Sequence, residues 1–320
     1  MANNTTAPTF TAETDIEKEL YTNETVLDIT FKLMTYTIIG SVGIIDNIFV
    51  VFVIARSKQM RQKFTNWFLI NQSVIDGLAS FWMLLDALEV GKSSSFEGMS
   101  GEIRCRFLKT RYFLWMGYVA STYNLVMISI DRYFEIVHAV FYKTHIKRWI
   151  ICVMLMLPHL LSGIYNLISV IHARVKRGIC AEFDGMSHQW EFVAMGIGAF
   201  VFSFAIPIAI LCICYVCIGY FLQKSPGVKS SRSNSKTKLN VIKTLAIVCI
   251  VFLLCWIWNS VLFLLFSIDV VKINFDGIFY HLTVTAVNIN CIVNPVIYAF
   301  KYERFKSEVR KLVHWRTNGV

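Results

Sequence analysis

Seven long apolar stretches, separated by short polar segments, constrain the fold of this 320-residue chain more than any other feature. A helix needs about 20 mostly apolar residues to cross a bilayer, where every backbone polar group must be satisfied internally. The stretches of this length are Phe31–Ala55, Asn66–Val90, Phe107–Val137, Trp149–Ile171, Phe192–Leu222, Leu239–Ile268 and Ile278–Phe300. The composition agrees, because 56% of residues are hydrophobic and 16% are charged. We therefore predict an all-α membrane protein with a seven-transmembrane helix bundle.

Polar segments flank the bundle at both ends of the chain. We expect an N-terminal tail over residues 1–30, a transmembrane domain over 31–300, and a cytosolic segment over 301–320. The last segment contains a short amphipathic eighth helix at about Tyr302–Trp315. It has no cysteine for palmitoylation, so we expect this helix to bind the membrane through its own apolar face. The polar start lacks the pattern of a cleavable signal peptide, so we expect the first apolar stretch to direct insertion.

The basic residues predict the orientation of the chain, because short cytosolic loops of membrane proteins are enriched in Lys and Arg. Basic residues gather in the loops after the first, third and fifth stretches and in the C-terminal segment. The N-terminal tail is acidic and carries glycosylation sequons at Asn3, Asn4 and Asn23. We expect a multi-pass plasma-membrane protein with a glycosylated extracellular N-terminus and a cytosolic C-terminus. The net charge of +10 lies in these loops, so we expect no nucleic-acid partner.

Polar side chains inside the apolar stretches are candidate functional residues. A charge at mid-membrane costs at least about 2.5 kcal/mol, so Asp76 in the second stretch needs a compensating role. Asn47, Ser121, Asn290 and Asn294 lie at matching depths in other stretches. Two explanations stay open. Hydroxyl and amide oxygens around a carboxylate suit a small hard cation such as sodium, or a protonated Asp76 belongs to an ion-free polar core.

Two short motifs lie near the ends of apolar stretches. Asp131-Arg132-Tyr133 closes the third stretch, although an ordinary surface pair with a snorkelling Arg has the same pattern. Asn294-Pro295 interrupts the seventh stretch, and a Tyr follows three residues after the proline. The proline frees a backbone carbonyl that polar neighbours must satisfy in hydrocarbon. This motif predicts a bend that packs against polar residues inside the bundle.

Together these motifs resemble those of the rhodopsin-like (class A) G-protein-coupled receptors, over about residues 31–315. Each stretch carries at least one matching signature. The matches are Asn47, Asp76, Asp131-Arg132-Tyr133, Trp149, Pro158, Pro207, Tyr215, Phe252, Cys255, Trp256, Asn294-Pro295 and Tyr298, with Phe305 in the eighth helix. The resemblance implies that Asp131 restrains Arg132, and that Arg132 with Tyr215 and Tyr298 forms the inner switch. The full switch set is Asp131, Arg132, Tyr133, Tyr215, Asn294, Pro295 and Tyr298.

The resemblance also implies two structural sites. One is a disulfide between Cys105 and Cys180, which are the two cysteines outside the apolar interiors of the stretches. The other is a sodium site formed by Asp76, Ser121, Asn290 and Asn294. We expect no other cofactor and no other metal.

Several positions depart from the family pattern. Trp258 stands where the sixth stretch normally has proline, so a kink there needs another cause. Asp46 replaces a usual Gly, while Glu135 and Ala139 replace a usual Ala and Pro. The segment Lys236-Thr237-Lys238 offers no acid to pair with Arg132, which predicts raised basal activity. Cys105 lies slightly farther before Arg132 than usual, and we expect the junction between loop and helix to absorb the difference.

The ligand pocket that the resemblance implies opens outward between stretches three, five, six and seven. Its expected lining is Leu114, Trp115, Tyr118, Ser203, Trp256, Asn259, Ser260, Val284 and Asn288. Leu114 stands at the position of the amine-binding Asp, and Asn288 at that of the retinal Lys, which argues against both ligand types. Acids at the mouth (Asp86, Glu89) favour a cation, and bases (Lys109, Arg111, Arg174, Lys176, Arg177) favour an anion. Their mutual neutralisation is the third alternative. The aromatic, mostly uncharged floor of the pocket suits a small amphipathic molecule or the end of a peptide.

The favoured function is a receptor that transmits the binding of an extracellular ligand to a heterotrimeric G protein, with arrestin, receptor kinases and the lipid bilayer as further partners. The alternative is a membrane transporter or channel with a polar midplane site. That class more often shows repeated halves or several charges along one path, and this chain has neither. The stretches contain no paired catalytic motif, so we expect no enzyme.

Overall fold

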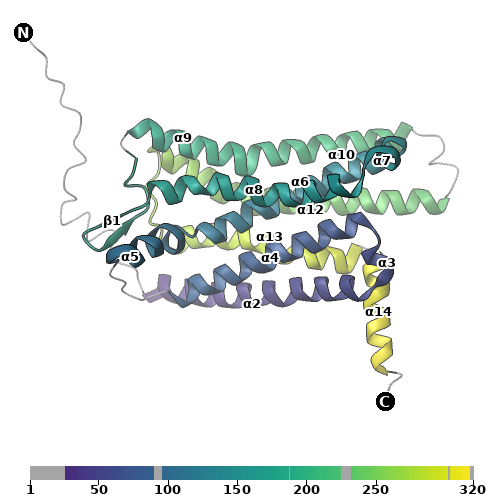
Figure 1. Cartoon of the computed structure of the whole chain (residues 1–320), viewed down its shortest axis with the longest axis horizontal. Coiled ribbons are helices and arrows are strands. Elements are labelled where there is room, and N and C mark those ends of the chain that lie inside the picture. The colour runs from purple at the N-terminus through teal and green to yellow at the C-terminus, as the bar shows by residue number, and fades with distance from the viewer. Residues whose placement is uncertain (1–25, 90–95, 187, 225–231, 302, 318–320) are drawn as a thin grey trace, which may run out of the picture.

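Seven long helices lie side by side in the computed structural model (Figure 1), as predicted. They are α2 (Val26–Arg56), α4 (Phe64–Leu88), α6 (Tyr112–Val137), α8 (Arg148–His172), α9 (Gln189–Phe200) continued by α10 (Ile206–Lys224), α12 (Arg232–Ser267) and α13 (Ile278–Lys301). The structure describes residues 26–89, 96–186, 188–224, 232–301 and 303–317. Within these ranges, the side chains of 232–245, 298, 300, 301, 303, 304 and 313–317 lie outside the description. The sequons at Asn3, Asn4 and Asn23 also lie outside the described residues.

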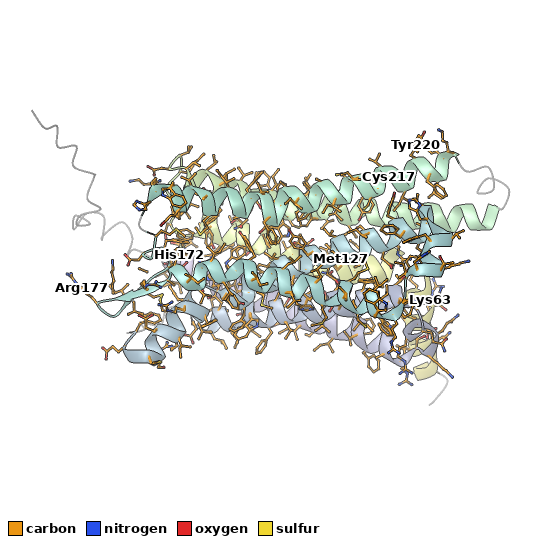
Figure 2. All side chains as sticks on the ribbon, turned by 45° about the horizontal axis from the view of Figure 1, so that its top comes forward. Lys63, Met127, His172, Arg177, Cys217 and Tyr220 are labelled. Atoms are coloured by element: carbon orange, nitrogen blue, oxygen red, sulfur yellow. A yellow bond between two sulfur atoms is a disulfide. The ribbon has the colours of Figure 1, made fainter. Side chains whose placement is uncertain are left out.

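The two ends of the bundle are distinct. One end carries α5 (Gly98–Arg104) and a hairpin of β1 (Arg174–Lys176) and β2 (Ile179–Ala181), and we call it the disulfide end. The other carries α3 (Lys58–Arg61), α7 (Ala139–His145) and α14 (Glu303–Thr317), and we call it the Arg132 end. Figure 2 shows Arg177 at the tip of the hairpin, with Lys63 and Tyr220 toward the opposite end.

The outer surface of the bundle is apolar along most of its length. Among the described residues, six helical segments are long and apolar enough to cross a membrane. Large apolar side chains such as Ile45, Ile164 and Val216 point outward and are more than 60% exposed, as lipid-facing residues are. The seventh helix, α13, has 24 residues but buries polar side chains along its inner face. The polar groups therefore gather inside the bundle and the apolar groups outside it.

Helix α6 is the centre of the bundle, because it packs against α4, α8, α10 and α13. Its start is irregular. The π-helical turn Cys105–Lys109 precedes it, and Arg111 has a left-handed backbone with a φ of 54°. This irregular turn absorbs the longer spacing between Cys105 and Arg132, as predicted. Cys105 and Cys180 form the expected disulfide, which ties the hairpin to the start of α6.

Proline shapes the fifth span. Pro207 has no N–H, and its ring clashes with the carbonyl four residues before it in a regular helix. The π-helical turn Val201–Ala205 directly precedes it and relieves this clash. Tyr123 of α6 donates a hydrogen bond to the carbonyl of Phe202 in this turn (2.9 Å). In the sixth span, where proline is absent, α12 runs without a break and Trp258 is 64% exposed.

The eighth helix, α14, runs across the direction of the bundle at the Arg132 end (Figure 1). Phe305 is buried and meets the ring of Phe49 in α2 edge to face, with centroids 6.3 Å apart. The predicted amphipathic helix is therefore present, and its anchoring aromatic residue packs against the first span.

Candidate functional site

A cavity of about 120 Å³ lies at the disulfide end. Helices α6, α8, α9 and α12 form its walls, and residues after β2 cover it. Five predicted pocket residues line it, namely Trp115, Ser203, Trp256, Asn259 and Ser260. The other four (Leu114, Tyr118, Val284, Asn288) are buried in the bundle and are not among the described lining residues.

Sequence analysis did not identify the cover of this cavity. Glu182 and Phe183 lie in the loop after β2 and line the cavity, and nothing in the sequence of that loop predicts this position. The disulfide at Cys180 is the signal that points to them, because it holds the neighbouring residues over the bundle. Burial raises the pKa of the Glu182 carboxyl above its usual value, while the charges of Arg111 and Lys109 lower it.

Several other charges at this end form ion pairs. Asp86 forms ion pairs with Arg111 (3.1 Å) and with Lys32 (3.6 Å). All three side chains are largely buried between α2, α4 and the start of α6. Lys176 of the hairpin pairs with Asp184 at 2.6 Å. Asp86 is therefore not free to meet a ligand cation.

The carboxylate of Asp76 is fully buried at the centre of the bundle. The amide nitrogen of Gln72 donates to both of its oxygens (3.1 and 3.0 Å) and lies 2.6 Å from the hydroxyl of Ser121. Asn294 donates to the same carboxylate at 2.9 Å. Asn124 donates to the carbonyl oxygen of Gln72 (2.7 Å), which fixes the orientation of the Gln72 amide.

In this arrangement the Gln72 amide occupies the side of Asp76 where a sodium ion would bind. Sodium would need the oxygens of Asp76 and Ser121, and the Gln72 amide nitrogen already lies within hydrogen-bond distance of all three. Asn290 and Asn294, the other predicted members of the site, are buried in α13. Asn47 donates to the Cys291 carbonyl (3.2 Å) instead of to Asp76. The sodium site therefore stays a prediction.

At the Arg132 end, Arg132 has a different partner from the one that the resemblance implies. Its guanidinium pairs with Glu135 at 2.6 Å, and no ion pair joins it to Asp131 within the described residues. The Asp131 carboxylate accepts hydrogen bonds from Tyr142 of α7 (2.7 Å) and Thr65 of α4 (3.4 Å). Helical spacing explains why Arg132 pairs with Glu135 and not with Asp131. Glu135 lies one turn after Arg132, whereas adjacent residues of a helix do not face each other.

Two other residues of the predicted switch, Tyr215 and Tyr133, have partners of their own. The hydroxyl of Tyr215 lies 2.7 Å from that of Ser129, one turn before Arg132 on α6. Tyr133 meets His138 at 3.1 Å. Asn294 and Pro295 are buried in α13, and the side chain of Tyr298 lies outside the described residues.

Burial and the nearby Asp131 carboxylate raise the pKa of Tyr142, so its hydroxyl keeps the proton that it donates.

The seven-helix bundle, with Asp76 buried at its centre and a cavity at one end, agrees with comparisons to known proteins. The sequence model of the family described as "7 transmembrane receptor (rhodopsin family)" matches residues 46–298. This chain belongs to that family. It is therefore a G-protein-coupled receptor for an extracellular ligand, a multi-pass protein of the plasma membrane, and not an enzyme. The transporter or channel alternative is not supported.

Similar receptors bind different ligands. The C-C chemokine receptor type 1 of Macaca fascicularis is 26% identical over 307 residues, covering 88% of this chain and 79% of that one. Somatostatin receptor type 2 of Mus musculus is 25% identical over 297 residues, covering 87% and 75%. Galanin receptor type 1 of Rattus norvegicus is 24% identical over 297 residues, covering 89% and 82%. Each resembles this receptor along most of the chain.

Proposed function

We propose that the ligand of this receptor is a peptide, and that one end of the peptide enters the cavity under the hairpin. The similar receptors are named for chemokines, somatostatin and galanin, which are peptides or proteins. A cavity of about 120 Å³ has room for one or two side chains. The rest of such a ligand would contact the hairpin and the disulfide end.

We also propose that the disulfide end faces outward and the Arg132 end faces the cytosol. Basic side chains of the Arg132 end support this orientation, among them Lys58, Arg61, Lys143 and Lys311. A tag at the N-terminus should be stained on intact cells, and a tag at the C-terminus only after permeabilisation. The reverse staining pattern would overturn the orientation.

Signal transmission then runs along the bundle. Trp256 lines the cavity, and its ring packs against Phe252 one turn deeper, with centroids 5.9 Å apart. Phe252 in turn contacts Phe204 of the fifth span (6.3 Å). A ligand that prefers one arrangement of these rings shifts the bundle toward that state. In the active state, Arg132 would leave Glu135 and contact the G protein.

The test of this function is ligand-free G-protein activation in cells, measured across several Gα types at matched surface expression. We expect the receptor to signal above empty vector, and Arg132→Ala to reduce that signal to the vector level. Lys58→Ala removes an exposed cation at the same end and should change little, which separates a specific effect from a general loss of charge. Equal signalling by Arg132→Ala and the unchanged receptor would refute the role of Arg132.

Three points stay predictions. The raised basal activity inferred from Lys236-Thr237-Lys238 involves side chains outside the described residues, and we expect Lys238→Glu to lower it. Binding of arrestin and phosphorylation by receptor kinases are expected for such a receptor. The serines where kinases would act are Ser225, Ser230, Ser231, Ser233 and Ser235, and their side chains lie outside the described residues.

A further inference from the structure

The cavity carries one charged side chain among its described lining residues, and that residue is Glu182. The rest of the lining is aromatic, aliphatic, amide or hydroxyl. The neutral polar residues of the lining include the amides of Asn166 and Asn259 and the phenols of Tyr165 and Tyr280. The charge of the cavity is therefore negative whenever Glu182 is ionised.

The fold holds Glu182 over the cavity. Cys180, two residues before Glu182, is paired with Val175 in the hairpin and is bonded to Cys105 at the start of the third span. On the other side, the ring of Phe183 meets three aromatic rings of the surrounding helices and loops, at 5.4 Å (Phe192), 6.0 Å (Phe275) and 6.4 Å (Phe263). The backbone at Glu182 is thus anchored before and after the residue.

The Glu182 carboxylate has no bonded partner within the described part of the chain. No hydrogen bond or ion pair reaches it, although the neighbouring acid Asp184 has Lys176 at 2.6 Å. The charged groups that act on it from a distance are Arg111, Lys109, Asp276 and Asp86. Arg111, the strongest of the cations, already binds Asp86 at 3.1 Å. Burying a carboxylate without a partner costs free energy, so a cation that binds Glu182 would stabilise the receptor.

We propose that the ligand carries a cationic group, an amine, guanidinium or amidinium, and that Glu182 binds it inside the cavity. This inference rests on the proposed peptide function and names the chemistry of the group that enters. The aromatic lining would favour the same charge, because cations are attracted to the faces of Trp and Tyr rings. Trp115, Tyr165 and Trp256 all line the cavity.

The test uses small aromatic probes and the purified full-length receptor in detergent. Benzamidine is a planar cation, benzamide is its neutral analogue of the same shape, and benzoate is the corresponding anion. Thermal unfolding is measured as a function of probe concentration, since a ligand that binds the native state raises the melting temperature. We expect benzamidine to act at a concentration about tenfold lower than benzamide, and benzoate to be weakest.

Three variants assign the effect to Glu182. In Glu182→Gln, benzamidine and benzamide should act alike, and in Glu182→Lys the preference should move to benzoate. Asp184→Asn removes an acid two residues away that is already paired, and it should keep the preference for benzamidine. If Glu182→Gln does not fold, the order of the three probes on the unchanged receptor still decides the question.

Several outcomes would overturn the proposal. They are an absent benzamidine shift at millimolar concentration, an equal or larger shift with benzoate, and an unchanged benzamidine preference in Glu182→Gln. Because the assay measures binding without a G protein, its failure is distinct from a failure of the Arg132→Ala experiment. A receptor that signals through Arg132 but prefers benzoate would keep the receptor function and refute the cationic ligand.

Discussion

Replacing Gln72 by Leu tests the most unusual feature of the bundle centre, the amide that lies against Asp76. Gln72 is fully buried, and Leu fills a similar volume, so the loss of packing is small. The variant removes a donor to a carboxylate, an interaction of about 1.5–3 kcal/mol, and the acceptor of the Asn124 amide, about 0.5–1.5 kcal/mol. Asn294 still donates to Asp76, which limits the loss.

We expect a destabilisation of roughly 2–3 kcal/mol, because hydrogen bonds between membrane helices are often worth less than in soluble proteins. The assay is thermal unfolding followed with a thiol-reactive dye. Buried free cysteines such as Cys214, Cys255 and Cys291 become reactive when the bundle opens. Equal stability of Gln72→Leu and the unchanged receptor would contradict the energetic role of the Gln72 amide.

Sodium provides the second half of this prediction. The unchanged receptor should melt at the same temperature in sodium chloride as in N-methylglucamine chloride of equal ionic strength. In Gln72→Leu the oxygens of Asp76 and Ser121 become available, so sodium should raise the melting temperature. At a sodium concentration a hundredfold above the dissociation constant, the free energy of unfolding would rise by about 2.7 kcal/mol. Adding Asp76→Asn to the variant should abolish the response. A sodium response of the unchanged receptor as large as that of the variant would refute the reasoning.

Three further predictions follow from the charged residues. Glu135→Ala frees Arg132 from its 2.6 Å ion pair and should raise ligand-free signalling several-fold in the G-protein assay, and Glu135→Asp should raise it less. Asp86→Asn leaves buried cations without their partner and should destabilise the receptor by about 3–5 kcal/mol in thermal unfolding, while adding Lys32→Met should recover part of the loss. Lowering the pH should weaken benzamidine binding, because burial raises the pKa of the Glu182 carboxyl above its usual value and the carboxyl gains a proton as the pH falls, while benzamidine stays cationic. Glu182→Gln should show no such change.

Hydropathy was sufficient to predict the seven helices, because a bilayer leaves the backbone few alternatives to a helix of spanning length. The junction at Cys105, the disulfide to Cys180 and the packing of Phe305 followed from the resemblance, and the structure contains all three. These features depend on local composition or on strongly specific motifs. They can be read from the order of residues without knowing which side chains meet.

The partners of the polar residues needed the tertiary structure. Gln72 lies four residues before Asp76, and Glu135 three residues after Arg132, so helical spacing permitted both contacts. Spacing does not say which face of each helix points inward, and a polar side chain inside a bundle chooses among several neighbours at similar depth.

The cavity shows the same limit more strongly. Glu182 is distant in sequence from the α6, α8 and α12 residues that share its cavity, and one disulfide and a cluster of aromatic rings bring them together. The order of residues determined that this chain crosses a membrane as a seven-helix receptor, since each helix must satisfy its own backbone in hydrocarbon. The tertiary structure decided which charges are neutralised and which remains open, since that depends on distances between segments that are separated along the chain.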